Sequence, residues 1–225
     1  MKTLCIIPAK GASTRLPRKN VILFCGKPLI YYTIVAAQKA AIFDDIIVST
    51  EDVLIREIAT GYGAEVMLRP EHLATDPAGV ADVCVYTVDK LKEAGREYAN
   101  LCILYPSAPL RDEHDIQGAF QLYQTGRGRS VFSVGEFDHP PFRAVTLHSG
   151  GRMEFLFPEF KKKKAQELPP AYHITGAIII VKIADFLKHK TYFLPPQLAY
   201  ILPRNHAVDI DTLHDLRYAE FLKRG

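Results

Sequence analysis

The feature that most constrains the fold is a regular alternation between short apolar runs and segments of helical spacing. The strand-like runs span residues 4–8, 45–49, 64–68, 101–105, 130–134, 176–182 and 200–202. The helical patterns span residues 29–40, 53–62, 80–94, 115–123 and 213–223. Strands that are apolar throughout need cover on both faces, and strands separated by helices pair in parallel. The sequence therefore predicts an α/β fold, with a mostly parallel sheet sandwiched by helices and right-handed crossovers.

This alternation is interrupted between residues 138 and 175, where the chain is rich in Pro, Phe and Lys. Ser149-Gly150-Gly151 predicts a hairpin turn between short strands at 144–148 and 152–157. Such a stretch cannot bury much apolar surface by itself. At about 150 residues per domain, we expect a single domain over residues 1–225 with residues 138–175 as an inserted arm.

Composition excludes several classes of protein. Apolar residues make up 48% and charged residues 24%, which are ordinary globular values. The net charge of +3, from 28 Lys and Arg against 25 Asp and Glu, is too balanced for a nucleic-acid binder. No apolar run reaches 18 residues, so we expect no membrane span. The first apolar run lacks the features of a signal peptide, and the four cysteines form no C-x-x-C pair, so we expect a cytoplasmic protein.

The richest segment follows the first strand and reads IPAKGASTRLPRKN. Ligands of open parallel sheets bind at the carboxyl ends of the strands. This loop carries small residues whose backbone can approach an anion, and four cations that can neutralise it, namely Lys10, Arg15, Arg18 and Lys19. We therefore expect a polyphosphate here; a solvated basic loop is the alternative. The segment lacks the glycine patterns of a dinucleotide dehydrogenase and of a P-loop NTPase.

A second signal is the segment VDIDT near the end of the chain. Alternation at a strand end would put Asp209 and Asp211 on one face. Two carboxylates on one face suit Mg²⁺, which uses one or two carboxylates together with substrate phosphates. The alternative is an Asp-Thr cap for the helix that follows.

Two further loops follow predicted strands. Pro70 holds Arg69 in an extended conformation, from which the Arg can read a base, hold a phosphate or form a structural ion pair. The segment YPSAPLR offers Ser107 and Arg111 on a loop stiffened by two prolines. In the arm, the lysine run 161–164 is typical of a solvated face, although one of its lysines could meet an acidic sugar.

Taken in order, these segments resemble the acylneuraminate cytidylyltransferases, the CMP-sialic acid synthetase family. The similarity runs through IPAKGASTRLPRKN, FCGKPLIYYTI, DDIIVSTED, YGAEVMLRPEHLATD, LYPSAPLRDEHDI, SVFSV, HPPFRA, QELPPAY and VDIDT. The resemblance implies a Rossmann-like nucleotidyltransferase fold. It also implies transfer of CMP from CTP to an acid sugar, Mg²⁺ or Mn²⁺ as the metal, and a homodimer whose inserted arm crosses to the other subunit. The segments YPSAP, HPPFRA and QELPPAYH are closest to the branch that serves bacterial nonulosonic acids such as pseudaminic or legionaminic acid.

The resemblance also implies a role for individual positions. The expected catalytic residues are Lys10, Lys19 and Asp211. The expected nucleotide-binding residues are Ala9, Lys10, Gly11, Ser13, Arg15, Lys19, Asn20, Arg69 and Ala78. The expected sugar-binding residues are Tyr105, Ser107, Arg111, Lys164 and Gln166, and the expected metal ligands are Asp209 and Asp211. Departures from the family pattern, most of them on the sugar side, are Lys10, Thr14, Tyr105, Ala108, Lys164, Thr175 and Ile179.

Three alternatives remain at this level. A CMP-Kdo synthetase shares the fragment ASTRLP. A sugar-1-phosphate nucleotidyltransferase would use another nucleoside triphosphate. A binding module would hold a nucleotide without turnover, which the departures at Lys10, Thr14 and Ile179 would permit.

Overall fold

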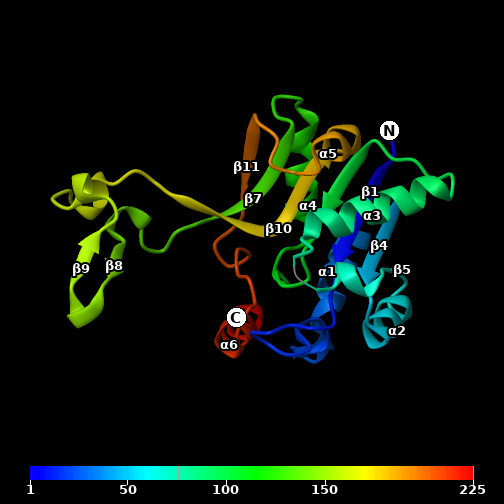
Figure 1. Cartoon of the computed structure of the whole chain (residues 1–225), viewed down its shortest axis with the longest axis horizontal. Helices are drawn as coiled ribbons and strands as arrows, with labels where there is room; N and C mark the ends of the chain where they lie inside the picture. The colour runs from blue at the N-terminus through cyan, green and yellow to red at the C-terminus, as the bar shows by residue number, and fades with distance from the viewer. Residues whose placement is uncertain (76, 225) are drawn as a thin grey trace.

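The fold is a seven-stranded sheet with helices on both faces (Figure 1), described here from a computed structural model for residues 1–75 and 77–224. The strand order is β11-β7-β10-β6-β1-β4-β5. In chain order these strands are β1 Thr3–Pro8, β4 Asp45–Thr50, β5 Glu65–Leu68, β6 Asn100–Ile103, β7 Ser130–Glu136, β10 Tyr172–Lys182 and β11 Gln197–Ile201. Among these strands β10 alone runs antiparallel, to β6 and β7. The predicted mostly parallel sheet is confirmed.

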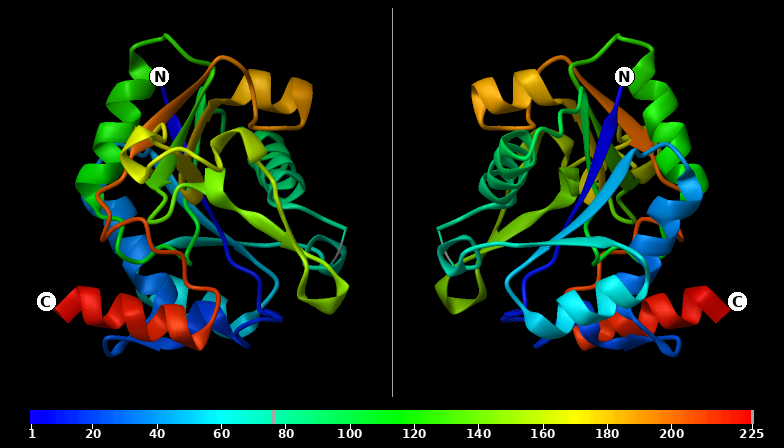
Figure 2. Two further views of the ribbon diagram at one scale, coloured as in Figure 1. Left: turned by 90° about the vertical axis from the view of Figure 1, so that its left-hand side faces the viewer. Right: turned by 90° about the vertical axis from the view of Figure 1, so that its right-hand side faces the viewer.

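The strands are apolar throughout because both faces of the sheet are covered (Figure 2). In β1, Cys5 and Ile7 pack toward one core, whereas Leu4 and Ile6 pack toward the other. The first core is closed by α1 Leu29–Ala40, α2 Val53–Gly61 and α4 Glu113–Gln124. The second is closed by α3 Val80–Glu93 and α5 Ile183–His189.

A third, smaller core lies beyond the carboxyl edge of the sheet. It joins the loop after β1, the small hairpin of β2 Leu23–Phe24 and β3 Lys27–Pro28, and α6 Leu213–Arg224. Its buried members are Leu16, Phe24, Leu29, Leu110, Ile210, Leu216 and Ala219. This core holds segments from both ends of the chain against each other.

The inserted segment projects far from the body of the molecule (Figure 1). It leaves after β7, forms the hairpin of β8 Val145–Leu147 and β9 Met153–Phe155, and returns into β10. The turn at 149–151 joins these two strands as expected. None of residues 138–171 is buried, and Leu147 and Met153 are 77% and 62% exposed.

The structure corrects the sequence-based prediction in three places. Helix α5 was not predicted, because its seven residues are too few for a clear helical period. Strand β10 begins at Tyr172 rather than at residue 176, since Tyr172 to Ile174 already pair with β7. Residues 208–212, expected at a strand end, form an extended loop outside the sheet. No helix in the described residues is long and apolar enough to cross a bilayer.

Strand β10 contains an irregularity that brings its backbone against the ring of Tyr105. Gly176 has φ +68°, and a Cβ there would lie 2.7 Å from the Cδ2 atom of Tyr105. We expect Gly176→Ala to lower the free energy of unfolding by about 1–3 kcal/mol, because the backbone strain and the overlap add together. Urea denaturation measures the change. The control Gly61→Ala, which meets no atom within 4 Å, should change stability little; equal losses in the two variants would contradict the argument.

Candidate active site

A pocket of about 270 Å³ lies at the carboxyl edge of the sheet. It is built by the loop after β1, the loop after β6, the start of α3 and the loop before α6. Residues that the sequence predicted for the site and that line this pocket are Lys10, Ser13, Arg15, Lys19, Asn20, Tyr105, Ser107 and Asp211. The parallel arrangement thus brings together residues from both ends of the chain.

Asp211 is the point at which the basic loop and the acidic loop meet. Its Oδ1 atom accepts a hydrogen bond of 2.9 Å from Nζ of Lys19, and its Oδ2 atom lies 2.7 Å from Nη1 of Arg15. Lys19 is largely buried, with 17% of its side chain exposed, whereas the Arg15 side chain is 69% exposed. In the free protein the two cations therefore neutralise the carboxylate that was predicted to hold a metal.

The acidic loop is fixed by the residue between its two carboxylates. Ile210 is fully buried in the third core, and its backbone N–H donates to the carbonyl oxygen of Ser107 at 2.8 Å. The two residues that flank Ile210 are more exposed. Asp211 lines the pocket, whereas Asp209 is not among the lining residues. The predicted alternation is present, although the segment is a loop rather than a strand.

The helix cap that was the alternative to a metal role is present, and Thr212 of the VDIDT segment makes it. The N–H of Asp215 donates to the hydroxyl of Thr212 at 3.3 Å, and the N–H of Thr212 donates to the carboxylate of Asp215 at 2.7 Å. The side chains of Asp209 and Asp211 take no part in this cap. Their carboxylate oxygens are ligands of the kind that a divalent cation binds, so the donor set fits such an ion.

The environment of Asp209 differs from that of Asp211. Asp209 is exposed as a residue, yet its carboxyl group is crowded by protein atoms. Burial raises the pKa of Asp209; a hydrogen bond from Ser107 opposes the rise, and the charge of Asp211 adds to it. A cation bound between the two carboxylates would offset both the burial and the repulsion.

Arg69 lies outside the pocket and is held by a residue that the sequence analysis did not select. Its side chain is 3% exposed and pairs with Glu51, with Nη2 and Nε lying 2.8 and 3.0 Å from Oε2. The other Glu51 oxygen accepts a hydrogen bond of 2.6 Å from the N–H of Gly11. Glu51 directly follows β4 at the carboxyl edge of the sheet, and this position in the sequence could have identified it as a candidate site residue.

The backbone of the basic loop is accordingly less open to an anion than predicted. The N–H of Gly11 is occupied by Glu51, and a Cβ at Gly11 would lie 2.5 Å from Oδ2 of Asp52. The N–H of Ala9 donates to the carbonyl oxygen of Ser49, and Ala9 is fully buried. Asn20 supports the loop from within, because its side-chain amide donates to the carbonyl oxygen of Lys10 at 2.8 Å.

Other predicted residues lie elsewhere. Arg111 is buried with 1% exposure, and burial lowers its pKa to about 10. Its Nη2 donates to the hydroxyl of Thr33 at 2.8 Å, while Nε and Nη1 have no partner among the described residues. Ala78 is half-buried just before α3. Lys164 and Gln166 lie on the exposed arm, away from the pocket of their own chain (Figure 1).

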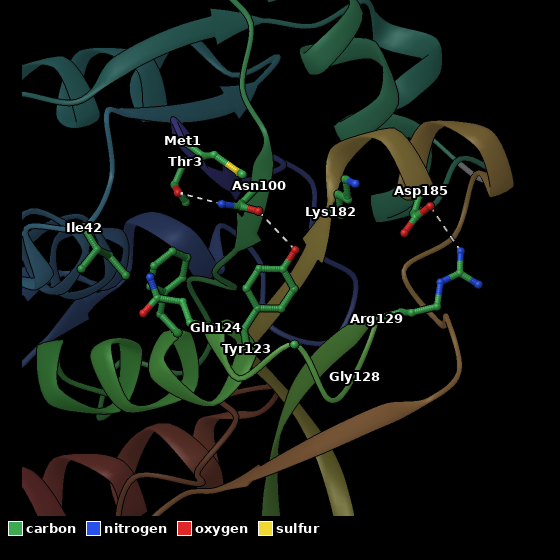
Figure 3. A pocket seen from close by; sticks show the side chains of 12 residues that line it. Met1, Thr3, Ile42, Asn100, Tyr123, Gln124, Gly128, Arg129, Lys182 and Asp185 are labelled. Atoms are coloured by element: carbon green, nitrogen blue, oxygen red, sulfur yellow. Dashed lines mark hydrogen bonds and ion pairs between the residues drawn. The ribbon is translucent and has the colours of Figure 1, made fainter.

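A larger pocket, seen from close by in Figure 3, lies at the opposite end of the sheet from the candidate site. It has a volume of about 620 Å³ and is lined by residues at the amino ends of β1, β6 and β7, including Thr3, Asn100 and Arg129. Asn100 and Tyr123 are joined there by a hydrogen bond of 3.2 Å. Strand β1 separates this pocket from the carboxyl edge, so it takes no part in the candidate site.

Comparisons with known proteins agree with this geometry. A family model described as Cytidylyltransferase matches residues 4–138. A pseudaminic acid cytidylyltransferase of Campylobacter jejuni is 36% identical over 223 residues, which cover 99% of this chain and 96% of that protein. A CMP-N,N'-diacetyllegionaminic acid synthase of Legionella pneumophila is 32% identical over 230 residues, with 99% and 96% covered. An N-acylneuraminate cytidylyltransferase of Streptococcus agalactiae is 34% identical over 220 residues, which cover 96% of this chain but 52% of that protein.

Solved structures show the same fold at low sequence identity. A CMP:2-keto-3-deoxy-manno-octonic acid synthetase complexed with CTP has a TM-score of 0.74 at 16% identity, covering 100% of this chain and 99% of the other. A 4-diphosphocytidyl-2C-methyl-D-erythritol synthase of Anaerococcus prevotii has a TM-score of 0.67 at 10% identity, covering 100% and 99%. The predicted Rossmann-like nucleotidyltransferase fold is confirmed.

The pair of Glu51 with Arg69 gives a prediction on stability. Removing Glu51 leaves a buried guanidinium without its partner, so Glu51→Ala should lower the free energy of unfolding by about 3 kcal/mol. Chemical denaturation measures this loss. The matched control is Glu57→Ala on the exposed face of α2, where a surface substitution should change stability by no more than about 0.5 kcal/mol. A Glu51→Ala loss as small as that of the control would contradict the assignment.

Proposed function

The chain belongs to the cytidylyltransferase family, and we propose that it transfers CMP from CTP to the anomeric hydroxyl of a nonulosonic acid, releasing pyrophosphate. One observation carries the proposal. Lys19 and Arg15 from the loop after β1 meet Asp211 from the other end of the chain in a pocket at the carboxyl edge of the sheet. A triphosphate needs cations for its oxygens and carboxylate ligands for its metal. The pocket supplies the cations and one carboxylate, Asp211, and Asp209 lies two residues before it in the sequence.

The basic loop is proposed to hold the triphosphate. Lys10, Arg15 and Lys19 all line the pocket, and their charges can neutralise phosphate oxygens. Ser13 and Asn20 line the same wall and add polar groups. Because Lys19 and Arg15 pair with Asp211 in the free protein, a triphosphate that takes over these cations leaves the Asp211 carboxylate available for a metal ion.

Asp209 and Asp211 are the proposed ligands of Mg²⁺. When bound there, Mg²⁺ supplies neutralising charge at the phosphate oxygens and lowers the pKa of the attacking hydroxyl. The protein itself does little covalent chemistry in such a transfer and acts mainly by positioning the groups and stabilising charge. The anomeric hydroxyl attacks the α-phosphorus in line with the departing pyrophosphate.

The sugar is proposed to be a nonulosonic acid of the pseudaminic or legionaminic type. Val80, Tyr105 and Pro106 give one side of the pocket an apolar surface that suits an acyl methyl group, and Ser107 adds a hydroxyl beside it. The hydroxyl of Tyr105 lies 3.5 Å from that of Tyr192, which fixes the ring. Relatives that act on pseudaminic and legionaminic acids match this chain along almost its whole length. The similarity to the Kdo-activating enzyme, at 16% identity, concerns the fold.

A homodimer is proposed because the apolar side chains of the arm are exposed in their own chain. Leu147, Met153 and Leu156 are exposed apolar side chains on a hairpin that buries none of its residues. Two copies related by a twofold axis would cover both arms. The same arrangement would bring Lys164 and Gln166 toward the other subunit's pocket, where a lysine can meet the sugar carboxylate. A cytoplasmic location is supported by four free cysteines, three of them buried.

Pyrophosphate release tests the function. With CTP and Mg²⁺ we expect release with pseudaminic or legionaminic acid, and little with Kdo or with ATP, GTP or UTP as the nucleotide. Asp211→Asn should reduce turnover on the order of 10²-fold or more, because a ligand to the transition-state charge is lost. The control Asp89→Asn, on the exposed face of α3, should keep full turnover. Release with Kdo alone, or full turnover of Asp211→Asn, would contradict the proposal.

The arm gives a separate prediction on assembly. Light scattering after gel filtration should give the mass of a dimer for the wild-type protein. Leu147→Glu should shift it to a monomer, because a charge in the apolar contact opposes association. Phe221→Glu, at an exposed apolar residue of α6 outside the arm, is the control and should stay dimeric. A wild-type monomer would overturn the assembly without touching the proposed reaction.

A further inference from the structure

We infer that His206 is a positioning residue, which acts through Asp115 to fix the loop that carries Asp209 and Asp211. The inference rests on the proposed function, since it concerns how those two carboxylates are held. His206 lies in the loop between β11 and α6, and Asp115 lies in the first turn of α4. Neither residue lines the candidate pocket, and neither was selected from the sequence.

The contact itself is short and largely buried. Nδ1 of His206 lies 2.7 Å from Oδ2 of Asp115. The Asp115 side chain is 4% exposed and that of His206 is 22% exposed. Because a carboxylate can only accept, Nδ1 of His206 carries the proton and donates it. A charge-assisted hydrogen bond that is shielded from water is one of the stronger contacts a loop can make.

The side chain of Asp115 is itself held in place by hydrogen bonds. Its carboxylate also accepts a hydrogen bond of 3.1 Å from the N–H of Asp112, and its own N–H donates to the Asp112 carboxylate at 3.0 Å. This reciprocal cap fixes the Asp115 side chain at the end of α4. The Arg111 charge lies nearby, and Asp115 opposes the fall in the Arg111 pKa that burial causes. The buried carboxylate therefore interacts with the Arg111 charge as well as with His206.

The same loop has little freedom elsewhere. Leu202 is joined to β7 by a hydrogen bond of 2.9 Å to the carbonyl oxygen of Val134. Ala207 packs so tightly on Gly135 that a Cβ at Gly135 would lie 2.8 Å from the Ala207 methyl group. The next anchor is the N–H of Ile210 on Ser107. His206 and Arg204, whose side chain pairs with Asp138, are thus side-chain anchors on the β11 side of the carboxylates, and Ile210 is the anchor between them.

The distance along the chain makes the anchor effective. Asp209 is three positions after His206 in the sequence, a span of about 10 Å at most. Because only Ala207 and Val208 lie between them, a change in the position of His206 acts first on Asp209. A misplacement of about 1 Å can cost on the order of 10²-fold in rate. Residues that orient metal ligands typically change metal affinity by about 10–100-fold when they are removed.

Asp112, Asp115 and His206 form a cluster that could hold a metal ion, since their ligand atoms lie within 4.8 Å of one another. Its atoms are engaged in the helix cap and in the contact with His206 instead. We therefore assign this cluster the role of connecting α4 to the acidic loop, and not that of a metal site.

The test compares His206→Leu with His206→Asn, because the Asn amide can replace the donor at Nδ1 whereas Leu cannot. Electron paramagnetic resonance measures the affinity of each variant for the Mn²⁺–CTP complex without any sugar. We expect about a 10-fold or greater loss of affinity in His206→Leu and recovery to within about 3-fold of wild type in His206→Asn. His214→Leu, on the exposed side of α6, is the matched control and should bind as the wild type does.

Two further readouts separate positioning from general stability. The melting temperature identifies a variant that has merely unfolded. If His206→Leu unfolds, His206→Asn still tests the inference. In calorimetric titration with EDTA, His206→Leu should bind CTP as tightly as the wild type does, because the basic loop is untouched and only the metal-dependent part of binding is lost. A folded His206→Leu protein with wild-type Mn²⁺–CTP affinity overturns the inference alone. A wild-type protein that does not bind Mn²⁺–CTP overturns the proposed function and the inference together.

Discussion

The ion pairs between Asp211 and the cations Lys19 and Arg15 are the contact on which the candidate site depends. Lys19 and Asp211 are 192 positions apart in the sequence, and the third core, which includes both Leu16 and Ile210, brings their loops together. In the free protein these pairs satisfy the carboxylate and both cations. A triphosphate competes for the two cations, and a divalent ion competes for the carboxylate. Their binding is therefore expected to be coupled, and the coupling must be reciprocal.

The parallel sheet explains why one edge gathers so many functional groups. The loops after β1, β4, β5, β6 and β11 all leave at the carboxyl edge, and the arm leaves and returns there as well. The antiparallel strand β10 allows that return, because it enters the sheet from the same edge. An insertion at this position therefore projects beside the pocket without disturbing the two main cores.

Sequence patterns predicted the elements whose signal is local. The buried strands, the basic loop and the alternation about Ile210 follow from apolar runs, charge and spacing that can be read directly. Three features depend on contacts between distant segments: the pairing of Arg69 with Glu51, the burial of Arg111 and the link from His206 to Asp115. For Arg69 the sequence left a ligand role and a structural ion pair open, and the structure shows the ion pair. Arg111 was expected to bind the sugar, whereas the structure buries it.

The most direct test is calorimetric titration of CTP into the wild-type protein and Asp211→Asn, with Mg²⁺ and with EDTA. The account predicts that Mg²⁺ strengthens CTP binding to the wild type and that this gain is lost in the variant. In EDTA the variant should bind CTP at least as tightly as the wild type, because Lys19 and Arg15 are released from the carboxylate. A variant that keeps the full Mg²⁺ effect, or that binds CTP more weakly than the wild type in EDTA, would contradict the account.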